Sequence, residues 1–414
     1  MRDDHPQTLA STDAFAAAPA AVQPFIDSGD LAGAVTLIWR SGRIEQVATL
    51  GWRDLEARAP MQRDALFRIA SMTKPVTTAA ALMLMDEGRL SLSDPITRWA
   101  PEFADMRVLR DPAGPLEDTV PAGRPITVED LMTHRAGLAY GFSSVGPIAA
   151  AHEAALGHPL ESPHTPDSWM AALGALPLSY QPGERLHYSH ATEVLGFIVG
   201  RIAGTSLGAF LAERVFGPLG MGDTDFWTPP GKRDRLATLY SFNEGRGVLA
   251  PVPTPERSEP PAYEAGGGGL ISTADDYLKF ARLLLGDGEV DGVRLLKSET
   301  VRDMRVNRLT AAQREVPFLG LPMWAGMGFG LGLSVVDDPS KNLLGVGSLG
   351  SFGWPGAYGT WWQADPAKDL ILIYLVAHAI PLGPDAGASI AAGRGMAGRM
   401  ALPMFQRAVY AALG

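Results

Sequence analysis

The chain has 414 residues, of which 46% are hydrophobic and 19% charged. This composition is typical of a globular protein with a large core rather than of a disordered one. The formal net charge is −10, and no long run of Lys or Arg occurs, which argues against nucleic acid as a partner because binding it requires a clustered basic face. The absence of cysteine excludes disulfides, thiolate zinc sites and a cysteine nucleophile.

The N-terminal segment does not have the pattern of a secretory signal. Asp3 and Asp4 stand where such a signal carries positive charge, and Pro19 interrupts the alanine-rich stretch that follows. No window approaches eighteen uninterrupted apolar residues, the length expected of a membrane span. We therefore predict a cytoplasmic protein that does not bind a membrane.

Hydrophobic periodicity and turn signals predict helices at both ends of the chain and strands near both ends. In chain order we expect a helix over 14–26, a hairpin of strands 34–39 and 44–52, a helix over 71–87, helical segments broken by Pro/Gly-rich loops, strands over 328–336, 356–363 and 370–378, and a closing helix over 390–413.

This order of elements predicts an α+β fold. The hairpin and the lack of a regular βαβ alternation favour an antiparallel sheet assembled from both chain ends and flanked by the terminal helices. We expect two units: an α/β domain formed by residues 1–70 and 320–414, and a mainly helical domain formed by residues 71–319. The active site would lie in the cleft between them.

Ser71-Met72-Thr73-Lys74 opens the first strong helix. Residues three apart share a helical face, so the Lys74 nitrogen can reach the Ser71 oxygen. A serine hydroxyl needs a base to become nucleophilic, and lysine can serve only where desolvation or a nearby cation disfavours its charged form. Taken alone, the pattern is a weak signal, and it more often reflects a serine that caps the helix and an exposed lysine.

Further motifs follow in a fixed order. Tyr188-Ser189-His190 precedes an apolar helix, and a Gly-Trp-Pro-Gly-Ala-Tyr-Gly stretch occupies 353–359. With the segments ITVEDLMTHRAGL (126–138), FGPLGM (216–221) and GGGGLISTADDYLKF (266–280), the chain resembles the serine β-lactamase and penicillin-binding-protein superfamily, and within it most closely the β-lactamase-like (family VIII) carboxylesterases. The resemblance runs from about residue 31 to beyond residue 378 and implies a β-lactamase/transpeptidase-like fold.

The resemblance implies a mechanism for each matched position. Ser71 would attack an ester carbonyl and form an acyl-enzyme. Lys74 and Tyr188 would share the proton as a coupled pair, Tyr188 acting as general base toward Ser71 and then as acid toward the leaving alkoxide. The backbone N–H groups of Ser71 and Ala357 would form the oxyanion hole. No cofactor is implied.

Two motifs depart from the penicillin-recognising members. Where those members have Lys-Thr-Gly, which binds a substrate carboxylate, this chain has Trp354-Pro355-Gly356. We therefore expect small-molecule substrates that are short neutral esters, with Trp354, Gly356 and Tyr358 beside them. His190 replaces the Asn that usually ends the second motif, and it is either a polar wall of the substrate site or an exposed histidine at a helix start.

Three rival motifs carry less weight. Gly204 to Gly208 fits the Gly-x-Ser-x-Gly elbow of α/β-hydrolases, but a helix rather than a strand precedes Ser206, which we expect to cap the next helix. The glycine pattern over 345–350 lacks the helix that a dinucleotide site needs. His152-Glu153 misses the His-Glu-x-x-His spacing, and we predict no metal.

The sequence thus predicts a serine carboxylesterase. A β-lactamase or D-amino-acid peptidase, and an acyltransferase that uses the same acyl-enzyme, stay open as alternatives. The oligomeric state is not predicted.

Overall fold

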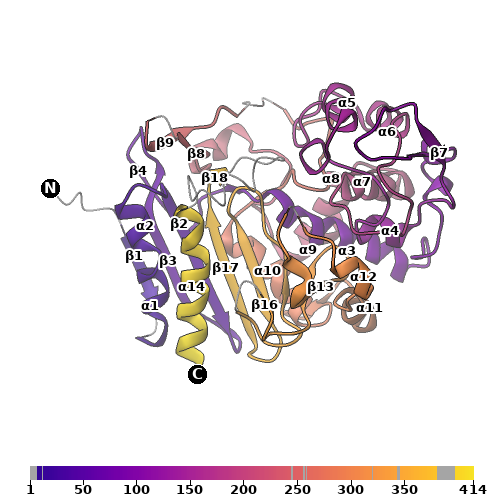
Figure 1. The fold of residues 1–414 in the computed structure, drawn as a ribbon. Coiled ribbons are helices and arrows are strands. Elements are labelled where there is room, and N and C mark those ends of the chain that lie inside the picture. The colour runs from indigo at the N-terminus through magenta and orange to yellow at the C-terminus, as the bar shows by residue number, and fades with distance from the viewer. Residues whose placement is uncertain are drawn as a thin grey trace.

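An antiparallel sheet assembled from both ends of the chain organises the fold (Figure 1). The computed structural model describes residues 7–11, 13–243, 246–254, 257, 259–318, 320–342, 346–379 and 397–414. Within them the main sheet has nine strands in the order β1-β3-β2-β17-β16-β15-β14-β13, with β4 paired to β3. Its strands are β1 (Gln7–Ser11), β2 (Gly33–Arg40), β3 (Arg43–Asp54), β4 (Ala59–Pro60), β13 (Met327–Phe329), β14 (Ser334–Val336), β15 (Phe352–Gly353), β16 (Trp361–Asp365) and β17 (Leu370–Val376).

The pairing of β2 with β17 joins the two ends of the chain. Both strands are almost entirely buried, as expected of β-branched, apolar runs in the centre of a sheet that is covered on both faces. Leu37 lies opposite Ile373 and Ile38 opposite Leu372. Because side chains alternate along a strand, the first pair joins one core cluster and the second pair joins the other. The predicted α+β fold with an antiparallel sheet is confirmed.

Terminal helices cover one face of the sheet. They are α1 (Ala17–Ala20), α2 (Gln23–Asp27) and α14 (Ala397–Leu413), and Figure 1 shows α14 lying along the strands beside the N-terminal helices. The single helix predicted over 14–26 is wrong, because short helical segments replace it. Pro24 has no N–H to donate to the preceding turn, so a new helix starts there. Of the closing helix, residues 390–396 lie outside the described residues.

The opposite face is covered by α10 (Ala274–Leu285), which packs on β16 and β17. The Trp362 ring lies 5.6 Å from that of Tyr277 and 6.4 Å from that of Phe280. The helices α3 (Thr73–Asp86) and α7 (Ala191–Ala203) pack against each other next to it. The division of the chain into two domains at residues 70/71 and 319/320 stays a prediction. The helix α10 lies on the sheet, although its residues belong to the range predicted for the helical domain.

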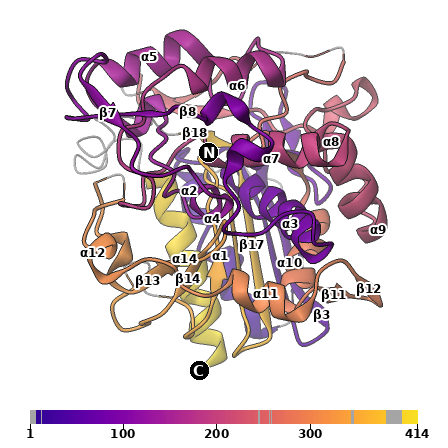
Figure 2. The ribbon, with the colours of Figure 1, turned by 90° about the vertical axis from the view of Figure 1, so that its right-hand side faces the viewer.

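The middle of the chain is mainly helical, and Figures 1 and 2 show most of its helices gathered to one side of the sheet. The helices are α4 (Val128–Met132), α5 (Pro147–Leu156), α6 (Pro166–Gly174), α8 (Leu207–Leu211), α9 (Gly217–Leu219), α11 (Ser298–Met304) and α12 (Ala311–Arg314). Short strands pair as β5 (Phe67–Arg68) with β10 (Ile271–Ser272), β6 (Arg107–Leu109) with β7 (Thr119–Pro121), β11 (Glu289–Val290) with β12 (Val293–Arg294), and β8 (Tyr240–Asn243) with β9 (Val248–Pro251) and β18 (His378–Ala379).

Two predicted strands are wrong in detail. The range 328–336 holds two strands, β13 and β14, joined by a turn in which Gly332 has φ +73°. In the range 356–363 only the end is strand, because residues 356–360 form a turn before β16 in which Gly359 has φ +84°. Glycine adopts such left-handed backbone readily, and both turns interrupt an otherwise apolar pattern. The predicted hairpin, the helix over 71–87 and most of the strand over 370–378 are confirmed.

Among the described residues no single helix combines the length and the apolar composition needed to cross a membrane; only the bent pair Ala191–Ala203 and Leu207–Leu219, with 74° between its parts, meets both criteria together.

The packing of α14 on the sheet gives a first prediction. Phe405 is fully buried and its ring lies 5.8 Å from that of Tyr374 on β17. Phe405→Ala should lower the free energy of unfolding by about 3–5 kcal/mol, the usual cost of deleting a buried phenyl group. Urea denaturation followed by circular dichroism measures this. Met404, which is 37% exposed, is the matched control, and Met404→Ala should change stability by at most about 0.5 kcal/mol. Equal effects would contradict the packing described.

Candidate active site

The first helical turn before α3 presents Ser71 at a strained point of the backbone. Ala70 has φ +46°, a conformation that costs a non-glycine residue energy and that is concentrated at functional sites. Ser71 itself is half-buried and lies in the 3₁₀ turn Ala70–Met72 that leads into α3. The Tyr277 hydroxyl of α10 donates to Met72 O at 2.8 Å and fixes this turn. The serine is thus held rigidly and stays accessible.

Lys74 is buried, and its amine faces three oxygens. The side chain is 1% exposed. Its Nζ lies 2.6 Å from Gly267 O, 3.2 Å from Tyr140 Oη and 3.5 Å from Ser71 Oγ. An ammonium can donate to all three oxygens, whereas a neutral amine can donate to Gly267 and Tyr140 and accept the Ser71 proton. The expected proximity of Ser71 and Lys74 is therefore present.

Tyr140 extends this contact to a buried carboxylate. Its hydroxyl donates to Glu193 on α7, at 2.8 Å and 3.1 Å from the two carboxylate oxygens. Burial raises the pKa of Glu193, although the nearby Lys74 opposes this, and burial next to Glu193 raises the pKa of Tyr140 well above its ordinary value. The chain of contacts allows a proton to pass from Lys74 to Glu193 through the Tyr140 hydroxyl.

Gly267 can approach both charged groups because it has no side chain. Its carbonyl accepts from Lys74, while a Cβ on the same residue would lie 2.5 Å from both Glu193 carboxylate oxygens, a distance that real Cβ atoms do not reach. The neighbouring Gly266 carbonyl accepts from Thr77 Oγ1 of α3 at 2.7 Å. The four-glycine segment 266–269 thus passes closely between α3 and α7.

Tyr188 lies on the other side of Lys74. Lys74 Nζ is 4.6 Å from the centre of the Tyr188 ring, and Trp354 Nε1 donates to Tyr188 Oη at 3.2 Å. Ser143 Oγ donates to the Tyr188 carbonyl at 2.7 Å and secures the loop that carries the ring. Ser71, Lys74, Tyr188 and Trp354 are therefore brought together, although within the described residues the phenol that hydrogen-bonds to Lys74 is Tyr140.

Ala357 belongs to the turn that precedes β16, not to a strand as expected. Thr360 Oγ1 donates to Ile69 O at 3.1 Å, so the turn lies directly beside the residues that precede Ser71. Gly356 lies so close to Ile69 that a Cβ there would overlap its carbonyl. Arg399 Nη2 of α14 donates to Ala357 O at 2.6 Å. Among the described residues no hydrogen bond is formed by the N–H of Ser71 or Ala357, which leaves both available for an oxyanion.

Buried histidines surround the two tyrosines. His190 starts α7 but is only 2% exposed, so it is not an exposed helix-start residue; its ring packs edge-on against Tyr140 at 4.3 Å. His134 packs against Tyr188 at 4.6 Å. Burial holds the pKa of each of these two histidines well below its ordinary value, and the nearby charge of Lys74 lowers it further. The surroundings of Lys74 thus contain neutral rings rather than competing cations.

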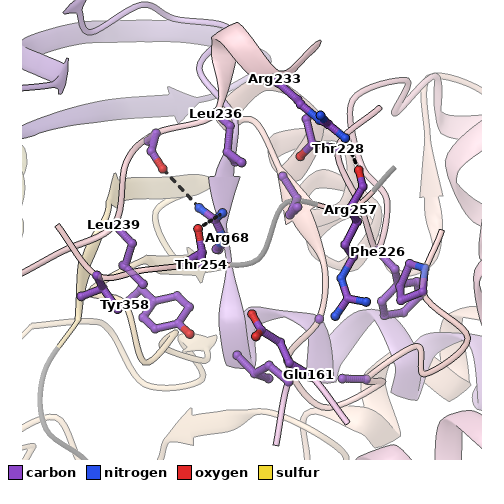
Figure 3. Close-up of a pocket in the computed structure, with 18 of the residues that line it drawn as sticks. Arg68, Glu161, Phe226, Thr228, Arg233, Leu236, Leu239, Thr254, Arg257 and Tyr358 are labelled. Atoms are coloured by element: carbon purple, nitrogen blue, oxygen red, sulfur yellow. Dashed lines mark hydrogen bonds between the residues drawn. The ribbon is translucent and has the colours of Figure 1, made fainter. Parts of the chain in front are cut away.

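A pocket of about 260 Å³ adjoins these residues (Figure 3). Tyr358, which follows Ala357, forms part of its wall, as do Gly268 and Gly269, which follow Gly267. Arg68, three residues before Ser71, also lines it. Three chain segments therefore lead from Ser71, Ala357 and Gly267 into the same cavity, which makes it a candidate substrate pocket.

The rival motifs do not assemble a second site. The Ser206 side chain accepts from Ala209 N and caps α8, and the helix α7 precedes it, so it lacks the strand that an elbow needs. Of the pattern over 345–350, residue 345 lies outside the described residues, and no helix follows it directly. Among the described residues there is no group of three or more His, Asp or Glu side chains arranged to hold a metal ion.

Sequence reasoning missed Tyr140, Glu193 and Arg399. Glu193 gave a usable signal, because an acidic residue in the fully apolar face of a helix needs a buried partner. The sequence around Tyr140 gave no comparable indication of a functional role, except that it lies shortly after the segment 126–138. The contact of Arg399 with Ala357 joins residues 42 apart in the chain, which no local pattern reveals.

Comparison with known proteins identifies relatives over almost the whole chain. A family model described as Beta-lactamase matches residues 18–394. The chain is 54% identical over 398 residues to Protein Rv1367c of Mycobacterium tuberculosis, covering 95% of this chain and 98% of that protein. It is 33% identical over 364 residues to Esterase EstB of Burkholderia gladioli, covering 83% and 86% of the two chains. Among solved structures, EstCE1, described as a hydrolase with promiscuous acyltransferase activity, superposes with a TM-score of 0.78 at 29% identity and covers 95% of this chain and 97% of its own.

The contact between Tyr140 and Glu193 gives a second prediction. Tyr140→Phe keeps the ring but leaves Glu193 and Lys74 without a shared hydroxyl, and such an unsatisfied buried group costs about 1–3 kcal/mol. We expect the free energy of unfolding to fall by that amount and ester turnover to fall at least about tenfold. Glu193→Gln should lower turnover similarly, and in the double variant the two losses should not add. Tyr180→Phe is the control, because no hydrogen bond of the Tyr180 hydroxyl is found among the described residues. Additive losses would contradict the coupling.

The buried histidines give a third prediction, on pH. Burial lowers the pKa of His152 and of His187 from 6.5 to about 4. Between pH 6.5 and 4 the unfolded chain therefore binds protons that the folded chain does not, and stability falls as the pH is lowered. For His152, which is 3% exposed, the loss across this window is ~3 kcal/mol. Urea denaturation at several pH values measures it. His152→Gln should flatten the profile and His158→Gln, at an exposed site, should not; an unchanged slope in His152→Gln would contradict the assignment.

Proposed function

The chain belongs to the Beta-lactamase family, and from this membership we propose that it is a serine carboxylesterase that hydrolyses short esters through an acyl-enzyme on Ser71. Family and relatives together indicate a serine hydrolase of the β-lactamase fold. The assignment of the nucleophile, its partners and the substrate class is our proposal.

One observation carries the proposal. The buried Lys74 amine lies 3.5 Å from Ser71 Oγ and is fixed by the Gly267 carbonyl. A hydroxyl becomes a useful nucleophile only beside a group that can take its proton. Burial disfavours the charged amine, and the contact through Tyr140 to Glu193 offers the lysine a place to leave a proton.

The reaction proceeds in two balanced halves. Ser71 Oγ forms a bond to the ester carbonyl carbon as its proton passes to the Lys74–Tyr188 pair, and the carbonyl electrons move onto the oxygen. The N–H groups of Ser71 and Ala357 stabilise that oxyanion, each worth roughly 2.7–4 kcal/mol in comparable enzymes. The bond to the alcohol oxygen then breaks, and the pair returns the proton to the alkoxide. A water molecule repeats the sequence on the acyl-enzyme and releases the acid and Ser71.

The residues around Tyr188 support an ester over a β-lactam. Trp354 stands where penicillin-recognising members have lysine, and its indole N–H is already used by Tyr188 Oη. Around these two rings lie Tyr140, Phe142, Phe318, Trp324 and Phe329, all members of one hydrophobic cluster or packed against it. Trp354 itself is only 1% exposed, so a substrate would meet the partly exposed members of this cluster, Phe142 and Phe318. Such aromatic side chains favour an uncharged group, and we propose that the part of the substrate that contacts them is neutral.

Acyl transfer to an alcohol or amine is the second candidate. EstCE1 is described as a hydrolase with promiscuous acyltransferase activity, and an acyl-enzyme reacts with any nucleophile that replaces water. Added butanol should therefore divert part of the acyl group from p-nitrophenyl butyrate to butyl butyrate, as read by gas chromatography. Butyric acid as sole product would restrict the enzyme to hydrolysis.

The proposed nucleophile gives a fourth prediction. With p-nitrophenyl butyrate the protein should release a burst of p-nitrophenol stoichiometric with the enzyme, because acylation precedes hydrolysis. Ser71→Ala should abolish the burst. Lys74→Met and Tyr188→Phe should each slow it about 10²- to 10⁴-fold, the usual contribution of acid–base catalysis. Stopped-flow absorbance measures all three variants.

Ser206→Ala is the matched control, because Ser206 caps α8 and its variant should keep the burst. A burst that survives Ser71→Ala, or disappears in Ser206→Ala while the fold is retained, would overturn the assignment. Turnover of a cephalosporin chromogen faster than of p-nitrophenyl butyrate would favour the β-lactamase alternative.

A further inference from the structure

The pocket beside Ser71 contains a partly buried cation, Arg68, that has no carboxylate partner among the described residues. Arg68 lies on β5, three residues before Ser71, so their Cα atoms are at most ~10 Å apart. Its guanidinium donates to Ala237 O at 3.3 Å and to Thr254 Oγ1 at 2.8 Å. Both acceptors are uncharged, and within the described part of the chain Arg68 forms no ion pair. The remaining N–H groups of its guanidinium have no protein acceptor there.

The surroundings of Arg68 leave its guanidinium able to bind an anion. Burial lowers the pKa of Arg68 from its ordinary value, and the electrostatic interactions with Tyr358 and Glu161 oppose this. A guanidinium that meets a carboxylate forms short, charge-assisted hydrogen bonds, so an anionic ligand would stabilise this partly buried charge. Ala237 O and Thr254 Oγ1 are the two uncharged oxygens that accept from the Arg68 guanidinium. Its other N–H groups are left to donate to a ligand.

The other charged residues of the pocket do not neutralise it. Among the described lining residues Arg257 is a further cation, and the one carboxylate is Glu161, which is exposed at the rim. Figure 3 shows Arg68, Arg257 and Glu161 arranged around the same cavity, with Tyr358 on its wall. Among the described lining residues, Arg68 and Arg257 therefore share the cavity with Glu161 as the carboxylate, in a protein whose formal charge is −10.

The cavity has the size and position of a substrate subsite. Its volume of about 260 Å³ is close to the ~300 Å³ at which small-molecule pockets begin. None of its lining residues belongs to the aromatic cluster around Trp354. The uncharged surface proposed for the reacting end of the substrate and the cationic pocket are therefore separate features of the site.

We propose that the ester carries a carboxylate remote from the reacting carbonyl, and that Arg68 binds this carboxylate in the pocket lined by Tyr358 and Glu161. The inference rests on the proposed esterase function and narrows its substrate class from short esters in general to half-esters of dicarboxylic acids or esters of hydroxy acids. In the first case the carboxylate belongs to the acyl part, and in the second to the alcohol part.

Two pairs of esters distinguish these sources. For the acyl part, p-nitrophenyl hydrogen adipate is compared with p-nitrophenyl hexanoate, which has the same number of carbons. For the alcohol part, 3-carboxyphenyl butyrate is compared with 3-carbamoylphenyl butyrate. In the wild-type protein kcat/KM should favour the anionic member of one pair.

Arg68→Gln should lower that anionic-to-neutral ratio about 10- to 100-fold, the range expected for a hydrogen-bonded charge, and Arg68→Lys should retain part of it. Arg63→Gln is the matched control, since Arg63 makes an exposed ion pair with Asp275 outside the pocket; its ratio should not change. A purely structural role for Arg68 would lower both members of a pair equally and leave the ratio unchanged.

Glu161→Gln provides a test of opposite sign that does not disturb a buried residue. Removing the carboxylate at the rim should raise the anionic-to-neutral ratio of kcat/KM about two- to fivefold. An unchanged ratio in both Arg68→Gln and Glu161→Gln overturns the inference, and if Arg68→Gln does not fold, an unchanged ratio in Glu161→Gln does so by itself. Failure of both ester pairs to acylate Ser71 in the wild-type protein would instead refute the proposed function.

Discussion

The arrangement of the site depends on the burial of one amine. Lys74 is removed from water, so its hydrogen bonds must be satisfied by protein atoms. The Gly267 carbonyl, the Tyr140 hydroxyl and the Ser71 hydroxyl meet that need, and one of the three is the proposed nucleophile. The reactive contact is therefore also a structural requirement, because a lysine at this position is stable only where those oxygens converge.

Each of these oxygens comes from a different part of the chain, and the fold explains how they meet. The pairing of β2 with β17 and the packing of α10 on the sheet hold the start of α3, through the hydrogen bond from Tyr277 to Met72. On the far side of the site, α7 supplies Glu193. Gly267 passes between the two helices because a side chain would overlap that carboxylate. Arg399 of the last helix fixes the Ala357 carbonyl in the same region.

Local patterns in the sequence predict the parts of this arrangement that depend on local interactions. The hairpin, the start of α3 and the proximity of Ser71 and Lys74 follow from residue periodicity, and the resemblance to a family added Tyr188. The strand expected around Ala357 failed because aromatic residues in alternation masked a turn whose formation depends on Gly359. The hydrogen bond from Tyr140 to Glu193 spans 53 residues, so it follows from the packing of helices and not from any short motif. Likewise, the pocket that Arg68 lines forms only where separate loops meet, whereas the expectation of a neutral ester rested on the local replacement of Lys-Thr-Gly by Trp354-Pro355-Gly356.

The central claim is that Ser71 is reactive because the Lys74 amine lies beside it. The most direct measurement is mass spectrometry of peptides from protein treated with a fluorophosphonate probe, with the labelling rate followed in parallel for Lys74→Met. The account predicts that the wild-type protein carries the probe on Ser71 and that Lys74→Met, still folded, is labelled at least about a hundredfold more slowly. A probe attached to Ser206 or to another serine, or an equal rate in the two proteins, would contradict it.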